Sequence, residues 1–172
     1  MPGAEVLCIR DWRTRLSARQ PMTETTPIEI AAALDGWVTG TFAALDALRV
    51  AATADAELQK NLDDCEALAW LGRYYASKIR GACALALFDQ DGNKFEHEAA
   101  LRHLAAALAH RNNYAAICDA DYVPAPYNRV GHVDLTALTE KAAADLDVAR
   151  TWKPGSLKDD GKRSGTEKGF RK

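Results

Sequence analysis

The sequence has few β-branched residues and no stretch in which apolar and polar residues alternate for long. Both features are typical of strands that bury one face, so their scarcity argues against a sheet. Alanine, the strongest helix former, is instead very abundant. The 172 residues, 48% hydrophobic and 27% charged, suffice for one domain with a real core. We therefore predict a single, almost entirely α-helical domain.

Cysteine is sparse and lacks the spacing of a metal site or of a disulfide framework. The four cysteines, Cys8, Cys65, Cys83 and Cys118, include no CxxC pair. On one helix, Cys65 and Cys83 would lie about 27 Å apart at 1.5 Å per residue, which is too far for a disulfide. We expect four small, buried hydrophobic side chains and no metal site.

Catalytic, targeting and membrane motifs are missing as well. The sequence contains no GxSxG, Walker or dinucleotide-binding motif, and local spacing places no histidine beside a cysteine. No apolar run reaches signal-peptide length or the roughly 20 residues of a membrane span. We therefore expect no catalytic residue, no cofactor and no membrane contact. The expected location is the cytoplasm, or outside it if the chain belongs to a longer secreted protein.

Charge of one sign is concentrated only at the C-terminus. The formal net charge is −2, but residues 153–172 hold seven Lys or Arg against three Asp or Glu, a net of +4 that leaves −6 for the rest. An acidic body with a basic tail offers no folded basic face, so we expect no nucleic acid partner. The tail has no core-forming pattern, and we predict disorder from Lys153 onward.

The stretch from Asp64 to Phe88 is apolar on nearly every side of a helix and should occupy the middle of the domain. Three apolar seams run along it, so we expect three neighbouring elements. Its small residues would let one helix approach closely. The seams are Leu62, Cys65, Ala69, Gly72, Ala76, Ile79, Cys83 and Leu87; Leu68, Leu71, Tyr75, Ala82 and Leu85; and Trp70, Tyr74, Gly81, Ala84 and Phe88.

Capping residues and turns divide the chain into four predicted helices, at residues 26–52, 54–88, 94–118 and 134–150. We predict that they pack as an antiparallel bundle over residues 26–152, with the second helix central. Residues 1–25 should be an extended arm and linker, in which EVLCIRDW is a lone strand or arm. The inward stripe of the first helix is predicted to be Ile30, Leu34, Trp37, Thr41, Leu45 and Leu48.

The least ordinary polar feature is the stripe of Glu66, Arg73 and Arg80, because steps of seven keep these residues on one face of an otherwise apolar helix. Two guanidinium forks would suit an acidic sugar or another carboxylate. Alternatively, both arginines pair with acids of neighbouring helices or extend to the surface.

His103 and His110 lack the i, i+4 spacing of a zinc site, and a solvated helix face explains them better.

The crossover from Asp119 to Val133 contains two prolines and a glycine, so we predict no helix there. Fifteen residues without regular structure are uncommon in a compact domain and are often functional. Tyr and Arg are residue types on which interfaces depend. We predict a partner-binding surface here, or alternatively a cover for the helix ends. Its candidate residues are Tyr127, Asn128, Arg129 and His132.

Three stretches carry a family resemblance: AWLGRYYASKIRGACALALFD, HLAAALAHRNNYAAI and YNRVGHVDLTALTEKAAADLDVARTWKPG. Together they resemble the helical C-terminal region of large bacterial carbohydrate-active proteins, the α-glucuronidase-like glycoside hydrolases and relatives that carry a family 6 carbohydrate-binding module. The resemblance covers residues 22–155 and includes no catalytic motif. It implies that the catalytic carboxylates lie on a preceding barrel and that this chain is a detached C-terminal domain.

Two functions remain open at this point. One is a non-catalytic helical accessory or interaction domain of a polysaccharide-degrading system, with a catalytic barrel domain or protein as its partner. The other is a small independent enzyme, or a binding protein for an acidic carbohydrate or carboxylate, that uses Arg73 and Arg80 or the face of His103 and His110. The lack of a nucleophile and base constellation favours the first function.

Overall fold

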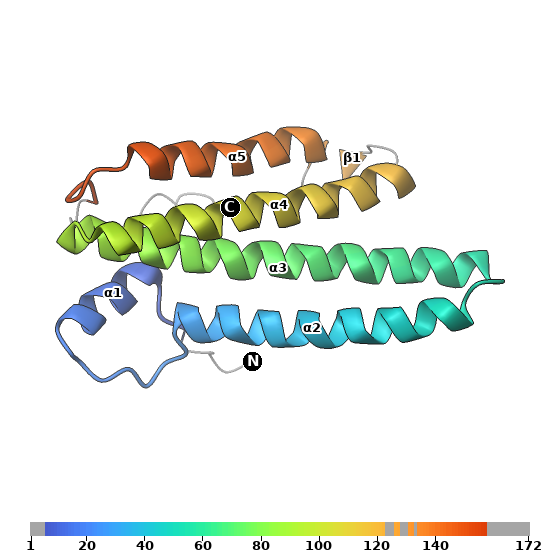
Figure 1. The fold of residues 1–172 in the computed structure, drawn as a ribbon, viewed down its shortest axis with the longest axis horizontal. Helices are drawn as coiled ribbons and strands as arrows, with labels where there is room; N and C mark the ends of the chain where they lie inside the picture. The colour runs from blue at the N-terminus through green and yellow to red at the C-terminus, as the bar shows by residue number, and fades with distance from the viewer. Residues whose placement is uncertain (1–5, 123–125, 128–130, 133, 158–172) are drawn as a thin grey trace, which may run out of the picture.

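The computed structural model describes residues 6–122, 126–127, 131–132 and 134–157 (Figure 1). The described residues form five α-helices: α1 (Ile9–Ser17), α2 (Pro27–Ala51), α3 (Ala56–Asp91), α4 (Lys94–Asp121) and α5 (Leu135–Thr151). Two strands of two residues each, β1 (Pro126–Tyr127) and β2 (Gly131–His132), lie between α4 and α5. The predicted all-α class is confirmed.

The structure has a helix where EVLCIRDW predicts a strand or extended arm. Cys8 is the N-cap of α1, and its Sγ accepts a hydrogen bond from the Asp11 backbone N–H at 3.4 Å. Leu7 and Trp12 are buried in one cluster with Cys83 of α3. Burying these apolar side chains favours a helix packed on the body over an exposed arm. Strand-like pairing in this segment is limited to Val6, which forms an isolated parallel bridge with Thr25.

The start of α2 follows the prediction, whereas its buried face does so only at Leu45. Thr26 and Glu29 form the capping box, with a proline at the first helical position. The buried residues of this face are Ala31, Val38 and Leu45, spaced by sevens. Predicted core residues three positions further along are turned away by about 60°. The predicted inward positions Trp37 and Leu48 are 70% and 48% exposed.

The cause of this rotation lies in α3. A Cβ at Gly72 would come within 2.6 Å of the Val38 side chain, so the missing side chain lets α2 approach closely at this point. Because the two helices are so close here, the residues of α2 that are buried against α3 are Ala31, Val38 and Leu45, and the larger side chains beside them stay outside the contact.

The long helix α3 is the centre of the fold, as predicted. It begins at the N-cap Asp55 and ends at Gly92, whose φ of 69° is the left-handed conformation that glycine favours. It packs against α1, α2 and α4, so the expectation of three neighbours is confirmed. The second predicted seam, however, is not buried: Leu68 is 65% and Tyr75 50% exposed, whereas Tyr74 of the third seam is buried.

The C-terminal elements lie close to their predicted positions. α4 continues to Asp121, three residues beyond the predicted end, and β1 pairs antiparallel with β2. The crossover is therefore shorter than predicted and contains a small hairpin. Asp134 is the N-cap of α5, as predicted, and accepts a hydrogen bond from the Ala137 backbone N–H at 3.0 Å.

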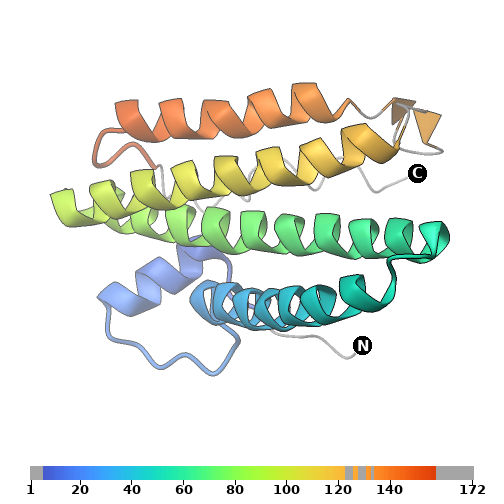
Figure 2. The same cartoon turned by 45° about the vertical axis from the view of Figure 1, so that its right-hand side comes forward.

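The four long helices lie in a row in the order α2, α3, α4 and α5, and short connections join α2 to α3 and α3 to α4 (Figures 1 and 2). Each packs on its neighbours in the row, while α2 and α5 lie at opposite edges. A row leaves one side of each edge helix without a neighbour from the described part of the chain. The uncovered sides of α2 and α5 are therefore available for binding.

Within the described residues, α2 is the one helix long and apolar enough to cross a membrane by length and composition, with a mean hydropathy of 1.2 over an 18-residue window. The expectation that no segment approaches that length is therefore too strict. Two features favour packing on protein instead. Asp35 and Arg49 of α2 form ion pairs with α3, and charged groups are costly inside a bilayer.

Candidate functional site

The predicted stripe of α3 lies on the side that faces α2. Arg80 pairs with Asp35, and Glu66 accepts a 2.6 Å bond from Arg49 of α2. Arg73 lies over the Phe42 ring, with 5.8 Å between Cζ and the ring centroid, and no described carboxylate pairs with it. Because Arg80 already has a carboxylate partner, the geometry does not favour a clamp of two arginines on one carboxylate ligand.

The structure brings the histidine stripe next to the arginine stripe, which sequence spacing alone did not show. Trp70 of α3 stacks on His110 of α4, with ring centroids 5.6 Å apart. Burial lowers the pKa of His110, and the nearby Arg73 lowers it further. Burial also lowers the pKa of His103, again with an arginine, Arg80, as the next cause. Both imidazoles are therefore neutral at pH 7, packed among aromatic and charged neighbours.

The predicted partner-binding residues of the crossover can be placed only in part. Tyr127 belongs to β1 and His132 to β2, and the backbone register pairs Tyr127 with Gly131. Asn128 and Arg129 lie outside the described residues. The crossover surface therefore stays a prediction.

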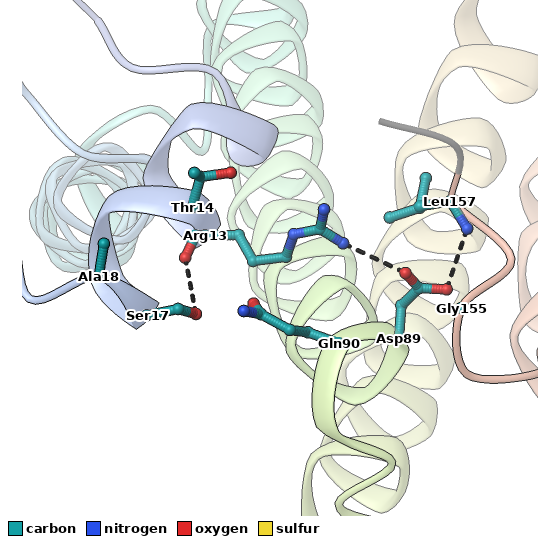
Figure 3. A pocket seen from close by; sticks show the side chains of 8 residues that line it. All are labelled: Arg13, Thr14, Ser17, Ala18, Asp89, Gln90, Gly155 and Leu157. Atoms are coloured by element: carbon teal, nitrogen blue, oxygen red, sulfur yellow. Dashed lines mark hydrogen bonds and ion pairs between the residues drawn. The ribbon is translucent and has the colours of Figure 1, made fainter. Parts of the chain in front are cut away.

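A carboxylate cluster that the sequence did not indicate joins α1, α3 and the C-terminal segment (Figure 3). The Asp89 carboxylate accepts from Arg13 at 3.2 Å, from the Trp152 indole at 2.8 Å, and from the backbone N–H groups of Ser156 and Leu157 at 2.8 and 3.1 Å. Three of these bonds are accepted by Oδ1, and the bond from Arg13 is accepted by Oδ2. An open pocket of about 470 Å³ borders the cluster.

The Asp89 cluster is therefore a structural clasp, because its carboxylate connects α1, α3 and the segment after α5. It also changes the predicted start of the tail. The exposed residues 153–157 are held at Asp89 through the backbone N–H groups of Ser156 and Leu157, whereas residues 158–172 lie outside the described part of the chain.

The cysteines do not form a reactive site in the described structure. All four are free thiols, and Cys8 and Cys65 are exposed, so the expectation of burial is wrong for these two. Cys83 and Cys118 are buried as predicted. Burial raises the pKa of the Cys83 thiol to about 12, and burial also raises that of Cys118. Both buried thiols stay protonated at neutral pH and are poor nucleophiles. Among the described residues, no cluster of three or more His, Cys, Asp or Glu could hold a metal ion.

Several large apolar side chains of α2 and α3 are exposed. Besides Val50, which is 77% exposed, four of them are about half exposed or more: Trp37 at 70%, Leu68 at 65%, Tyr75 at 50% and Leu48 at 48%. All four belong to apolar seams that the sequence predicts to be core. Residues patterned for burial but left exposed are a sign of a binding surface.

These residues lie on one side of the α2 and α3 pair. The ion pairs Asp35–Arg80 and Arg49–Asp63 show that the two helices run antiparallel. On one side of this pair, Trp70 of α3 stacks on His110 of α4. Helical spacing then places the exposed apolar residues on the other side, with Trp37 and Tyr75 at about the same level. We call this surface the α2–α3 apolar face: Leu34, Trp37, Thr41 and Leu48 of α2, and Leu68, Gly72 and Tyr75 of α3.

Comparisons with known proteins find no match to this chain among protein-family models, curated proteins or solved structures. They give no support to the resemblance to the C-terminal regions of glycoside hydrolases, and any function must be argued from the geometry.

Proposed function

We propose that this chain is a non-catalytic helical interaction domain that pairs with a second copy of itself through the α2–α3 apolar face. The observation that carries this proposal is the exposure of four large apolar side chains, Trp37, Leu48, Leu68 and Tyr75, on two adjacent helices. Solvating such a continuous surface is unfavourable, and burial against an equally apolar surface removes that cost.

The size of the face fits a weak, concentration-dependent dimer. From Leu34 to Leu48, α2 extends over roughly 21 Å, and two helices of about 10 Å diameter give a surface of roughly 420 Å² on each copy. Two copies would then bury roughly 840 Å², which is below the range of about 1,200 to 2,000 Å² for stable interfaces and is typical of transient ones.

The chemistry of the face favours a second copy over a charged partner. None of its seven residues carries a charge, so two identical faces can meet without repulsion between like charges. A two-fold axis brings the same surface of each copy together, which is the commonest symmetry of protein dimers. Trp37 and Tyr75 would be the central aromatic anchors. In such a dimer, α2 and α3 of each copy would form a four-helix arrangement between subunits, which differs from the bundle of four helices within one chain that the sequence predicts.

The proposed context is polysaccharide degradation, and it rests on the sequence resemblance alone. In that context the dimer would hold two catalytic barrel partners together and would itself have no glycosidase activity. The purified chain should therefore not hydrolyse glucuronosyl substrates. Turnover that persists through purification and is lost in Arg73→Ala would favour the independent enzyme instead.

Sedimentation equilibrium over a wide range of protein concentration tests the dimer. We expect a dimer for the wild type and a monomer for Trp37→Glu combined with Leu68→Glu, because each copy would bury two uncompensated carboxylates. Phe95→Glu is the matched control, since Phe95 of α4 is 81% exposed and lies outside the face. Circular dichroism should show equal helicity for all three proteins. A monomeric wild type, or a dimer that the double substitution leaves intact, would overturn the proposal.

A further inference from the structure

Arg111 of α4 is a buried cation held between two aromatic rings. Its side chain points toward α3, and the residue is only 8% exposed. The guanidinium Cζ lies 4.9 Å from the centroid of the Tyr114 ring and 5.7 Å from that of Tyr74. Tyr74 is itself buried in a cluster with Ala107 of α4 and Ala142 of α5. Arg111 thus lies where α3, α4 and α5 meet.

The two rings leave the hydrogen-bonding edge of Arg111 without an acceptor from the described residues, so this edge is left to solvent. A guanidinium has five N–H donors in its plane, whereas an aromatic ring interacts with the cation through its face. Within the described structure, no carboxylate or other hydrogen-bond acceptor binds Arg111. A buried arginine without such a partner is unfavourable unless an anion or water supplies one.

Nearby groups that could neutralise Arg111 are otherwise engaged. On the α5 side, Asp145 pairs with Lys78 at 2.7 Å. At the end of α4, Asp64 accepts a hydrogen bond from the Tyr122 hydroxyl. The Cys118 thiol is protonated at neutral pH, because burial raises its pKa. Electrostatically, the Cys118 thiol is influenced by Asp64 and Asp119 as well as by Arg111, so carboxylates lie in the same region as the guanidinium but do not bind it.

The guanidinium is also within reach of solutes. In the described part of the chain, no fully enclosed side-chain nitrogen or oxygen lacks a hydrogen-bond partner. Since the Arg111 nitrogens have no such partner, they must retain some contact with solvent. A small ligand can therefore approach the unsatisfied edge without unfolding the helices.

We propose that Arg111, between Tyr74 and Tyr114, is a binding site for an oxyanion of the carboxylate or phosphate class. Two parallel N–H groups of the guanidinium match two oxygens of such an anion, while the rings hold the fork in place. The site is separate from the α2–α3 apolar face, so it does not depend on self-association. Its ligand would link α4 to the neighbouring helices and stabilise the folded state.

The thermal midpoint at pH 7 tests this site, with sodium acetate and sodium phosphate compared against sodium chloride at equal ionic strength. We expect a saturable rise of the wild-type midpoint with at least one of the two oxyanions, and the comparison between them identifies the class. Arg111→Met should lose the rise, since it retains much of the side-chain volume but no donors. Arg102→Met is the matched control, because Arg102 is an exposed arginine of the same helix, and it should respond like the wild type.

A measurement on the wild type keeps the proposal testable if Arg111→Met does not fold. The side-chain Nε–Hε signal of Arg111, assigned with Arg111→Lys, should shift in a saturable way when the active anion is titrated. Equal midpoint responses of the wild type and a folded Arg111→Met would overturn the site. An Arg111 signal that neither acetate nor phosphate moves would overturn it as well.

Discussion

Arg13 of α1 and Asp89 of α3 form an ion pair across 76 residues of sequence, with side chains only 6% and 3% exposed. The same carboxylate binds the Trp152 indole and the backbone beyond α5. A single buried acid therefore fixes the N-terminal helix and the C-terminal segment to the same end of α3 (Figure 3). The N-terminal segment is held to α3 in addition by the buried cluster of Leu7, Trp12 and Cys83.

Replacing this acid should destabilise the fold strongly. Asp89→Asn removes the negative charge beside the buried Arg13, and losing one member of a buried pair costs about 3–5 kcal/mol. Asp145→Asn is the comparison, because the Lys78–Asp145 pair is more than one-third exposed at both side chains. Exposed pairs contribute about 1 kcal/mol or less. Urea denaturation measures both free energies of unfolding, and equal losses would contradict the clasp.

Local sequence signals predicted much of the helical framework. The capping box at Thr26 and the N-cap at Asp134 are short-range features, and the helices begin where these residues place them. The long central helix was also recognisable, because its apolar residues cover nearly its whole circumference. Such signals depend only on residues within a turn or two of each other.

Long-range contacts decided what the sequence could not predict. The buried face of α2 is set by Gly72, a residue of another helix, and the clasp joins residues 76 positions apart. Similarly, an apolar seam looks the same whether its partner is in the same chain or in a second copy. Trp37 and Tyr75 were therefore assigned to the core, although the monomer leaves both exposed.

Adjacent tyrosines of α3 should differ sharply in their effect on stability. Tyr74 is 8% exposed and Tyr75 is 50% exposed. Tyr74→Ala should lower the free energy of unfolding by about 3 kcal/mol or more, as other large core truncations do. Tyr75→Ala should change it by about 1 kcal/mol or less when measured at a concentration that keeps the chain monomeric. A larger loss for Tyr75→Ala would restore this residue to the core.

Two glycines should respond in opposite directions to the same substitution. A Cβ at Gly81 would lie 2.7 Å from Leu104 Cγ of α4, so Gly81→Ala forces the helices apart and should cost about 1–3 kcal/mol. A Cβ at Gly36 meets no atom within 4 Å. Gly36→Ala should therefore stabilise α2 by up to about 1 kcal/mol, through helix propensity alone. Thermal unfolding of both variants decides this, and stabilisation by Gly81→Ala would rule out the close contact with α4.

Acidification should weaken the packing of α4 on α3 through His103 and His110. Both have a pKa below the ordinary value of 6.5, with burial as the first cause. The unfolded chain therefore binds protons at a higher pH than the folded protein does. The resulting stability is fully present above pH 6.5 and is lost as the pH falls through 6.5 toward the lower folded-state pKa values.

Urea denaturation at pH 7.5, 6.5 and 5.5 should show this loss in the wild type. The double variant His103→Gln with His110→Gln should show a smaller loss, because it removes both titrating groups while keeping polar side chains. Nuclear magnetic resonance titration of the two imidazole rings provides the direct check. Protonation of His110 should begin only below its ordinary range, because a charged ring would be partly buried and would lie near Arg73. A midpoint at or above 6.5 for both rings would contradict this account of the α3 and α4 contact.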